Sequence, residues 1–200
     1  MLSNRQVNIF PVRLNDVDLH NKKISSKPIV IWFTGISGSG KTSLSIMLQK
    51  YLNEHHILNT VLDGDNLRSG INSDLDFSEK GRNENLRRIS HISKLFYENG
   101  FFTIVATISP FKKNRLQARK LFEEGAFCEV FLDANIDTCI MRGKSDLYKK
   151  AQMGKVKNFT GISSNYEKPK NPEIVLDTNS KKPKESLKEI INFLKLKKIL

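Results

Sequence analysis

The chain has 200 residues and a mass of 22.9 kDa, with 38% hydrophobic and 27% charged residues. That length suits one compact domain and excludes two full-sized ones, and the composition excludes a disordered or fibrous chain. The formal net charge of +12 favours anionic partners, which include nucleotides, other phosphates, nucleic acid and anionic membrane surfaces. Charge alone does not choose among them.

The two cysteines, Cys128 and Cys139, are too few for a disulfide framework or a four-ligand zinc site. Their apolar neighbours predict buried, unreactive thiols in a reducing compartment. No stretch approaches the roughly 20 apolar residues of a membrane span, and residues 1–21 lack the apolar centre of a signal peptide. We therefore expect a cytoplasmic protein that does not bind a membrane.

Short apolar runs alternate with helical patterns along the chain. After a lead-in over residues 1–27, the sequence predicts strands at 29–33, 60–62, 101–108, 127–132 and 174–176. Helical spacing of apolar residues predicts helices at 44–52, 86–97 and 115–124, and a last helix carrying Leu187, Ile190, Ile191 and Leu194. The many lysines near the C-terminus then form the solvated face of that helix rather than a tail for nucleic acid.

Strands that alternate with helices favour a parallel sheet covered by helices on both faces. The predicted class is α/β, with a P-loop NTPase-type sheet in a single domain over residues 28–200.

One motif carries a specific chemistry. The segment between the first predicted strand and helix matches G-x-x-x-x-G-K-[ST], with Gly35, Ile36, Ser37, Gly38, Ser39, Gly40, Lys41 and Thr42. Its glycines let backbone N–H groups approach phosphate oxygens, beside the positive N-terminus of the following helix. Lys41 is expected to reach the β- and γ-phosphates and Thr42 to ligate Mg²⁺. The motif predicts binding of a nucleoside triphosphate.

Acidic residues follow the second predicted strand at the edge where open α/β sheets bind ligands. There Asp63, beside Asp65, could hold a magnesium-bound water or accept a proton from an attacking hydroxyl. Asp133 is a rival magnesium aspartate, although its position before a predicted helix favours an N-cap.

Basic residues suggest a second anionic ligand. Arg68 follows Asp65, and Arg82 and Asn85 share one helix face, which favours a clamp for an anion. Arg87 and Arg88 are better explained as a solvated face. A compact kinase of a small anionic acceptor fits these features best.

Several further segments resemble the adenylylsulfate kinase (APS kinase) family of bacterial assimilatory type. They are Trp32–Lys41, Leu62–Arg68, Phe77–Glu79, Arg82–Arg88, Ile108–Phe111, Leu147–Ala151 and Asn158–Ile162. The resemblance covers residues 28–178 in the family's order and spacing. The combination of DGDN, ISPF and NFTGI is far more specific than the P-loop alone.

The resemblance implies transfer of the γ-phosphoryl group of ATP to the 3′-hydroxyl of adenosine 5′-phosphosulfate. The products would be 3′-phosphoadenosine 5′-phosphosulfate (PAPS) and ADP, in sulfate assimilation. Mg²⁺ would accompany ATP, and a homodimer is implied. The residues implied to bind the acceptor are Asp65, Arg68, Phe77, Arg82, Asn85, Ile108, Ser109, Lys149 and Phe159.

Within that set, Phe77 and Phe159 would sandwich the adenine. Lys149 would stabilise phosphates from a lid at about residues 142–166. Bacterial members carry a phosphoserine at the position of Ser109, although direct in-line transfer assisted by Asp63 and Lys41 needs no such step.

The chain departs from the family pattern at Gly143 and Lys144, where Asp and Pro are usual, at Asp76, and at Ser163–Asn165. These changes bear on lid movement and acceptor preference rather than on the reaction type. Two alternatives stay open: a P-loop kinase of another nucleotide-linked anion, and a non-catalytic nucleotide-binding protein.

Overall fold

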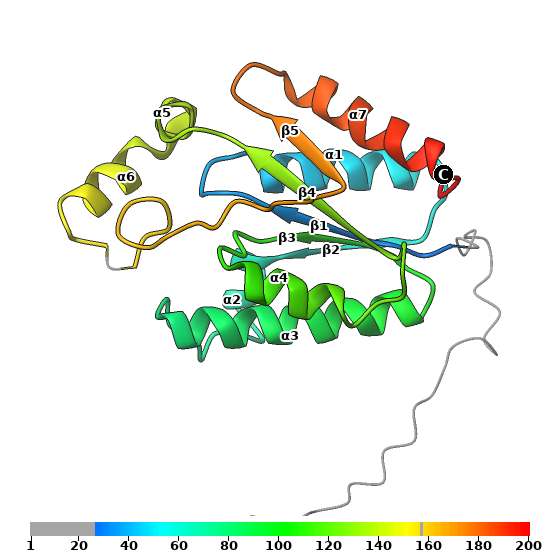
Figure 1. Cartoon of the computed structure of the whole chain (residues 1–200), viewed down its shortest axis with the longest axis horizontal. Helices are drawn as coiled ribbons and strands as arrows, with labels where there is room; N and C mark the ends of the chain where they lie inside the picture. The colour runs from blue at the N-terminus through cyan, green and yellow to red at the C-terminus, as the bar shows by residue number, and fades with distance from the viewer. Residues whose placement is uncertain (1–26, 157) are drawn as a thin grey trace, which may run out of the picture.

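The computed structural model describes residues 27–156 and 158–200, so the predicted lead-in, residues 1–27, lies outside the described residues except for its last position. The elements run in the order β1 (Val30–Thr34), α1 (Lys41–Glu54), β2 (Asn59–Asp63), α2 (Gly64–Arg68), α3 (Glu79–Glu98), β3 (Phe102–Ala106), α4 (Lys112–Arg119), β4 (Phe127–Asp133), α5 (Ile136–Cys139), a π-helical turn (Ile140–Lys144), α6 (Ser145–Gln152), β5 (Ile174–Asp177) and α7 (Pro183–Leu196) (Figure 1).

The sheet has the strand order β2-β3-β1-β4-β5, and every neighbouring pair is parallel. Central strand β1 pairs on both sides, with Val30 opposite Thr103 of β3 and Phe127 of β4. The predicted parallel α/β sheet is confirmed. All five carboxyl ends meet at one edge, which is where such sheets bind ligands.

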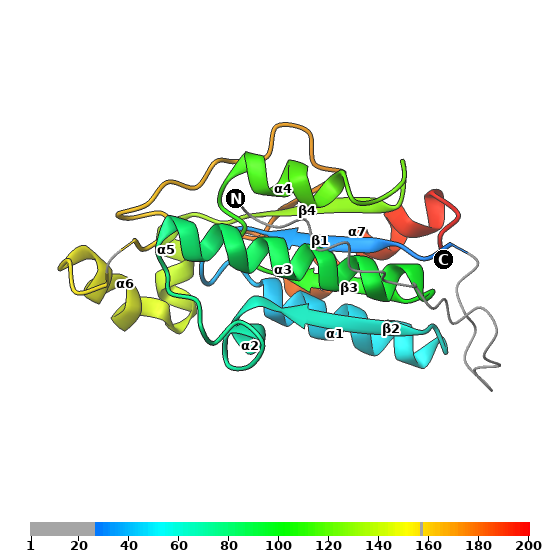
Figure 2. The same cartoon turned by 90° about the horizontal axis from the view of Figure 1, so that it is seen from below.

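Alternation along β1 builds two core layers, because successive side chains of a strand point to opposite faces. Ile31 and Phe33 pack with residues of α1 and α7, whereas Val30 and Trp32 pack with residues of α3 and α4. Figures 1 and 2 show the two helix pairs on opposite faces of the sheet. Helices on both faces exclude water from both sides of a nearly all-apolar strand, as the sequence predicted.

A third, smaller cluster lies beyond the end of the sheet, where α5 and α6 project in Figure 1. It joins Ile36 of the phosphate loop to Cys139, Tyr148, Ala151 and Phe159. The segment predicted as a lid is therefore seated on the phosphate loop through apolar contacts.

Several predicted boundaries differ from the structure. Helix α3 begins at Glu79, not at 86, because the Ser78 hydroxyl accepts from the Gly81 N–H and caps it. The helical spacing of apolar residues at 86–97 also predicted that Leu95 lies on the buried face of this helix, but its side chain is 61% exposed. Strand β3 ends at Ala106, and α4 both begins and ends earlier than the predicted 115–124.

The predicted N-cap at Asp133 is wrong. Asn135 caps α5, accepting from the Thr138 N–H over 2.7 Å, while the Asp133 carboxylate pairs with Lys168 at 2.9 Å. Asp133 is the last residue of β4, two positions too early to face the first N–H groups of the helix.

Candidate active site

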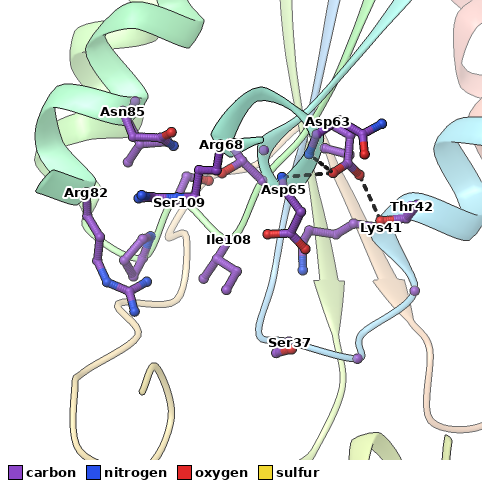
Figure 3. A pocket seen from close by; sticks show the side chains of 18 of the residues that line it. Ser37, Lys41, Thr42, Asp63, Asp65, Arg68, Arg82, Asn85, Ile108 and Ser109 are labelled. Carbon is purple, nitrogen blue, oxygen red and sulfur yellow. Dashed lines mark hydrogen bonds between the residues drawn. The ribbon is translucent and has the colours of Figure 1, made fainter. Parts of the chain in front are cut away.

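A cavity of about 530 Å³ opens at the carboxyl edge of the sheet (Figure 3). It brings together most of the residues predicted from the sequence. Those lining it are Ser37, Gly38, Gly40, Lys41, Thr42, Asp63, Asp65, Arg68, Phe77, Arg82, Asn85, Ile108 and Ser109. The phosphate loop and the arginine cluster thus face one shared space.

The phosphate loop turns where β1 ends, and its shape depends on glycine. Gly35 has φ +152°, and a Cβ there would lie 2.7 Å from Ser39 Oγ and 2.8 Å from the Leu132 carbonyl oxygen. Gly40 has φ +104° and directly precedes α1. The Lys41 ammonium donates to the carbonyl oxygens of Gly35 and Ile36, each at 2.8 Å. The cation is therefore already held at the loop where phosphates would bind.

Asp63 links the second strand to the P-loop helix. Its Oδ2 accepts from the Thr42 hydroxyl over 2.9 Å, while Oδ1 accepts from the backbone N–H of Asp65 at 2.9 Å and of Asn66 at 3.4 Å (Figure 3). The Asp63 side chain thereby caps α2 and is fixed in orientation. A carboxylate and a hydroxyl so placed form a pair of hard oxygen ligands.

Two arginines converge on the opposite side of the cavity. Arg68 lies over the Phe77 ring at 4.4 Å and donates to the carbonyl oxygens of Leu75 and Asp76, each at 3.0 Å. Burial lowers the pKa of Arg68, and burial followed by the charge of Arg68 lowers the pKa of Arg82. Two partly desolvated cations side by side favour an anion between them.

Arg82 also connects α3 to the lid segment. Its guanidinium donates to the Asn158 carbonyl oxygen at 2.6 Å, the Thr160 hydroxyl at 3.2 Å and the Phe77 carbonyl oxygen at 3.0 Å. The acceptor side of the cavity and residues 158–160 are therefore held to one another.

Asn85 is buried on α3, and the fully buried Asn72 donates to its Oδ1 over 2.9 Å. With the oxygen engaged, the Asn85 NH₂ group is left to donate toward the cavity.

Ser109 lies in the loop after β3 with φ +38°, a left-handed conformation uncommon for a residue with a side chain. Its Oγ, almost fully buried, accepts from Trp32 Nε1 at 3.1 Å. Thr34 donates to the Ile108 carbonyl oxygen at 2.8 Å. Two side chains of the central strand therefore hold the loop.

Some predicted site residues lie elsewhere. Gly35, Ile36 and Ser39 shape the loop from behind the cavity wall. Lys149 is exposed on α6, and Phe159 is buried with its ring 4.9 Å from that of Tyr148, edge to face. Neither lines the cavity, so this structure does not place Phe159 opposite Phe77.

A buried ion pair beside the site was not predicted from the sequence. Arg115 Nε lies 2.7 Å from Oε1 of Glu129, with both side chains at most 10% exposed. A glutamate within the apolar strand Phe127–Leu132 was the available signal, because a buried carboxylate in a central strand requires a partner.

Comparison with known proteins matches the adenylylsulphate kinase family model to residues 27–177. The chain belongs to the adenylylsulphate kinase family. It is 48% identical to the adenylyl-sulfate kinase of Clostridium acetobutylicum and 43% to that of Staphylococcus carnosus, each over 90% of this chain and 89% and 90% of the relatives. A solved structure of the APS kinase of Mycobacterium tuberculosis in complex with AMPPNP and APS superposes with a TM-score of 0.80 at 42% identity, covering 84% of this chain and 98% of that one.

Two departures from the pattern expected for the adenylylsulphate kinase family are Asp76 and the pair Gly143 and Lys144, which directly follows Arg142. The Asp76 carboxylate accepts from the Ser78 N–H at 3.1 Å and hydroxyl at 2.6 Å, steadying the start of α3. Arg142 donates to the Thr178 carbonyl oxygen beside a smaller cavity of about 140 Å³. Among the described residues, none of the helices is long and apolar enough to span a bilayer.

Proposed function

We propose that this protein is an adenylylsulfate kinase that transfers the γ-phosphoryl group of ATP to the 3′-hydroxyl of adenosine 5′-phosphosulfate, giving PAPS and ADP in sulfate assimilation. The observation that carries the proposal is the shared cavity, which has a phosphate loop on one side and the Arg68–Arg82–Asn85 cluster on the other. Donor and acceptor could thus meet without leaving the protein, which is the main requirement for phosphoryl transfer.

On the donor side, backbone N–H groups of residues 35–42 would hold the triphosphate at the N-terminus of α1. Lys41 would exchange its loop carbonyl partners for β- and γ-phosphate oxygens, a short movement because it is already at the loop. Its charge opposes the negative charge carried by the transferring group.

The donor set here fits Mg²⁺. Thr42 and Asp63 would hold the ion, directly or through water, and bound Mg²⁺ neutralises phosphate charge. Residues 27–156 and 158–200 contain no group of three or more His, Cys, Asp or Glu that could hold a metal. That suits an ion bound largely by phosphates rather than by an all-protein cage.

Asp63 would also orient the attacking hydroxyl and accept its proton. Three hydrogen bonds fix the carboxylate at the junction of the donor and acceptor sides. A general base must lie within hydrogen-bond reach of the proton that it accepts, and this fixed position meets that requirement.

On the acceptor side, Arg68, Arg82 and the Asn85 amide would bind the phosphosulfate, and Phe77 would stack on the adenine once Arg68 turns from the ring to the anion. Completing the predicted sandwich requires residues 158–160 to turn Phe159 out of its apolar cluster. Lys149 would approach in the same movement. We therefore include lid motion over residues 142–166 in the proposal.

For Ser109 we propose a lining role and direct transfer between the substrates. Its hydroxyl is buried and accepts a hydrogen bond from Trp32. Its left-handed backbone conformation shapes the loop that lines the cavity and does not direct the hydroxyl toward a phosphate as a nucleophile. A covalent phosphoserine step would first have to break that contact.

The test is ADP release in a coupled assay with ATP and Mg²⁺, with and without adenosine 5′-phosphosulfate, and PAPS identified by mass. The expected result is ADP formation that depends on the acceptor and matches PAPS one to one. Turnover only with a different nucleotide-linked anion would favour the alternative kinase, and ATP binding without any turnover would favour a non-catalytic binding protein.

A matched pair of variants tests the role of Asp63. Both Asp63 and Asp133 end strands at the same sheet edge, but only Asp63 lines the cavity. Asp63→Asn should lower kcat by about a hundredfold or more, whereas Asp133→Asn should leave it nearly unchanged. The reverse pattern would transfer the metal and base roles to Asp133.

We extend the proposal to a cytoplasmic homodimer, as the family resemblance implies. Light scattering on the purified protein tests the assembly, with twice the 22.9 kDa chain mass as the expected result.

A further inference from the structure

Arg115 is a buried arginine near the site whose hydrogen bonds go to backbone carbonyl oxygens rather than into the cavity where phosphates would bind. It is 2% exposed and lies outside the cavity, beneath the loop after β3 that carries Ile108 and Ser109, here called the acceptor loop. One nitrogen of its guanidinium donates to the Ser109 carbonyl oxygen and another to the Glu167 carbonyl oxygen, each over 2.7 Å. A single planar cation thus holds two segments that are far apart in the sequence.

One of those two segments lines the cavity, and the other lies against it. The first is the loop that carries Ile108 and Ser109, and the second is the chain that returns from the lid. They also bond directly, since the Glu167 N–H donates to the Pro110 carbonyl oxygen at 2.9 Å and the Lys112 N–H donates to Glu167 Oε2 at 2.6 Å. The Tyr166 hydroxyl lies 2.8 Å from Thr34 Oγ1, which itself donates to this loop.

Glu129 is what allows a cation to stay buried there. It stands opposite Trp32 in the register of β4 and β1, and its Oε1 lies 2.7 Å from Arg115 Nε. Without that carboxylate, desolvating the guanidinium would be strongly unfavourable. Trp32 in turn donates to Ser109 Oγ, so the ion pair and the indole act on the same residue.

We propose that Arg115, neutralised by Glu129, is a positioning residue of the acceptor site: it fixes Ser109 in its left-handed conformation and ties the acceptor loop to the return segment of the lid. Arg115 is not a catalytic residue, because it reaches the reacting groups only through the loop. The kinetic part of this inference rests on the proposed function, whereas the conformational part does not.

The chain offers a matched control in Arg119. It belongs to the same ionic group, pairing with Glu129 at 3.3 Å and Glu173 at 2.6 Å, but its hydrogen bonds go to Phe127, Glu129 and Glu173 rather than to Ser109 or Glu167. Arg115→Lys and Arg119→Lys each keep the charge and lose the planar fork. Three separate nitrogens of Arg115 reach Ser109, Glu167 and Glu129, and a single ammonium nitrogen cannot occupy all three positions. Only the first should disturb the acceptor loop.

The first readout needs no substrate. Trp32 is the single tryptophan of the chain, and its indole N–H bonds to Ser109, so its fluorescence reports the state of this loop. Arg115→Lys should change the emission maximum or intensity of the folded protein more than Arg119→Lys does, because Arg119 reaches Trp32 only through the Phe127 ring and not through Ser109. Identical spectra in all three folded proteins would overturn the proposal.

The second readout is kinetic. Arg115→Lys should raise the KM for adenosine 5′-phosphosulfate about tenfold or more, with the KM for ATP nearly unchanged, since small displacements of positioning groups have large effects. A merely structural role would lower the amount of active protein without splitting the two KM values. An equal rise in the KM values for both substrates would contradict the positioning role of Arg115. So would an equal rise in the KM for adenosine 5′-phosphosulfate in Arg119→Lys.

If Arg115→Lys does not fold, the double variant Arg115→Gln with Glu129→Gln removes both buried charges together and should show the same changes. Failure of the proposed function would appear as wild-type protein without acceptor-dependent turnover. The fluorescence comparison still decides the positioning role in that case.

Discussion

The side-chain amide of Asn72 donates to Oδ1 of Asn85 over 2.9 Å, and both side chains are buried. The loop after α2 thereby sets which end of the Asn85 amide faces the cavity, where we propose that the acceptor binds. An anion needs the NH₂ end, so the direction of this hydrogen bond has a functional consequence.

Removing this hydrogen bond should weaken acceptor binding selectively. Asn72→Ala is expected to raise the KM for adenosine 5′-phosphosulfate several-fold and to lower the free energy of unfolding by about 1–3 kcal/mol, because Asn85 loses a buried partner. Asn72→Asp should affect KM more, since a carboxylate only accepts and would turn the Asn85 oxygen toward the anion. Steady-state kinetics with each substrate varied, and denaturant unfolding, measure both effects. Asn99→Ala, which removes an exposed amide bonded to the Leu95 carbonyl oxygen, is the control.

A buried hydroxyl adds a hydrogen bond to the apolar contacts between the lid segment and the phosphate loop. Tyr148 is fully buried, and its OH donates to the Ser37 carbonyl oxygen over 2.8 Å. Tyr148→Phe should lower stability by about 1 kcal/mol and raise the KM for ATP a few-fold, because the loop loses its tie to α6. Tyr97→Phe removes a hydroxyl on α3, away from the loop, and should leave that KM unchanged. Equal ATP kinetics in the two variants would contradict the link.

Gly35 should not tolerate a side chain. A Cβ at this position would lie within 2.8 Å of the Leu132 backbone oxygen, which belongs to strand β4 and has little room to move because β4 is paired on both sides. Gly35→Ala should lower the free energy of unfolding by roughly 2 kcal/mol or more and weaken ATP binding. Gly70→Ala is the control, since nothing lies within 4 Å of its added Cβ. Thermal unfolding and calorimetric titration with ATP compare the two.

The buried thiol of Cys128 predicts a loss of stability in alkali. Burial raises its pKa to about 12, so between roughly pH 9 and pH 12 the folded protein keeps a proton that the unfolded chain releases. The native state then binds more protons than the unfolded state, and the free energy of unfolding falls as pH rises, by up to about 1.4 kcal/mol per pH unit. Urea unfolding from pH 8 to pH 10.5 should show a shallower decline for Cys128→Ala than for the wild type. Parallel declines would contradict the assignment.

Much of the donor side follows from local sequence. A short apolar run, a glycine-rich turn and a helical pattern correctly placed residues 35–40 between β1 and α1, with Lys41 and Thr42 beginning the helix, because the motif is contiguous. Asp63 was likewise predictable, since it follows a strand whose carboxyl end must reach the same sheet edge.

Local pattern failed where distant residues compete for a contact. Asp133 precedes a helix, as an N-cap does, yet Asn135 takes that role and Lys168 takes the carboxylate. The placement of Phe159 depends on Tyr148 and Ile36, which come from α6 and the phosphate loop. The spacing of residues along the chain does not predict contacts between segments that are distant in the sequence.

The sequence by itself determined the α/β class, the parallel sheet, the phosphate loop and the family, since these depend on periodicity and on contiguous motifs. Only the tertiary structure decided that Arg115 and Glu129 form a buried pair beneath Ser109, and that Asn72 orients Asn85. These contacts join residues brought together by strand order and helix packing. A buried charge or amide takes its meaning from the partner that folding supplies, and that partner is not its neighbour in the chain.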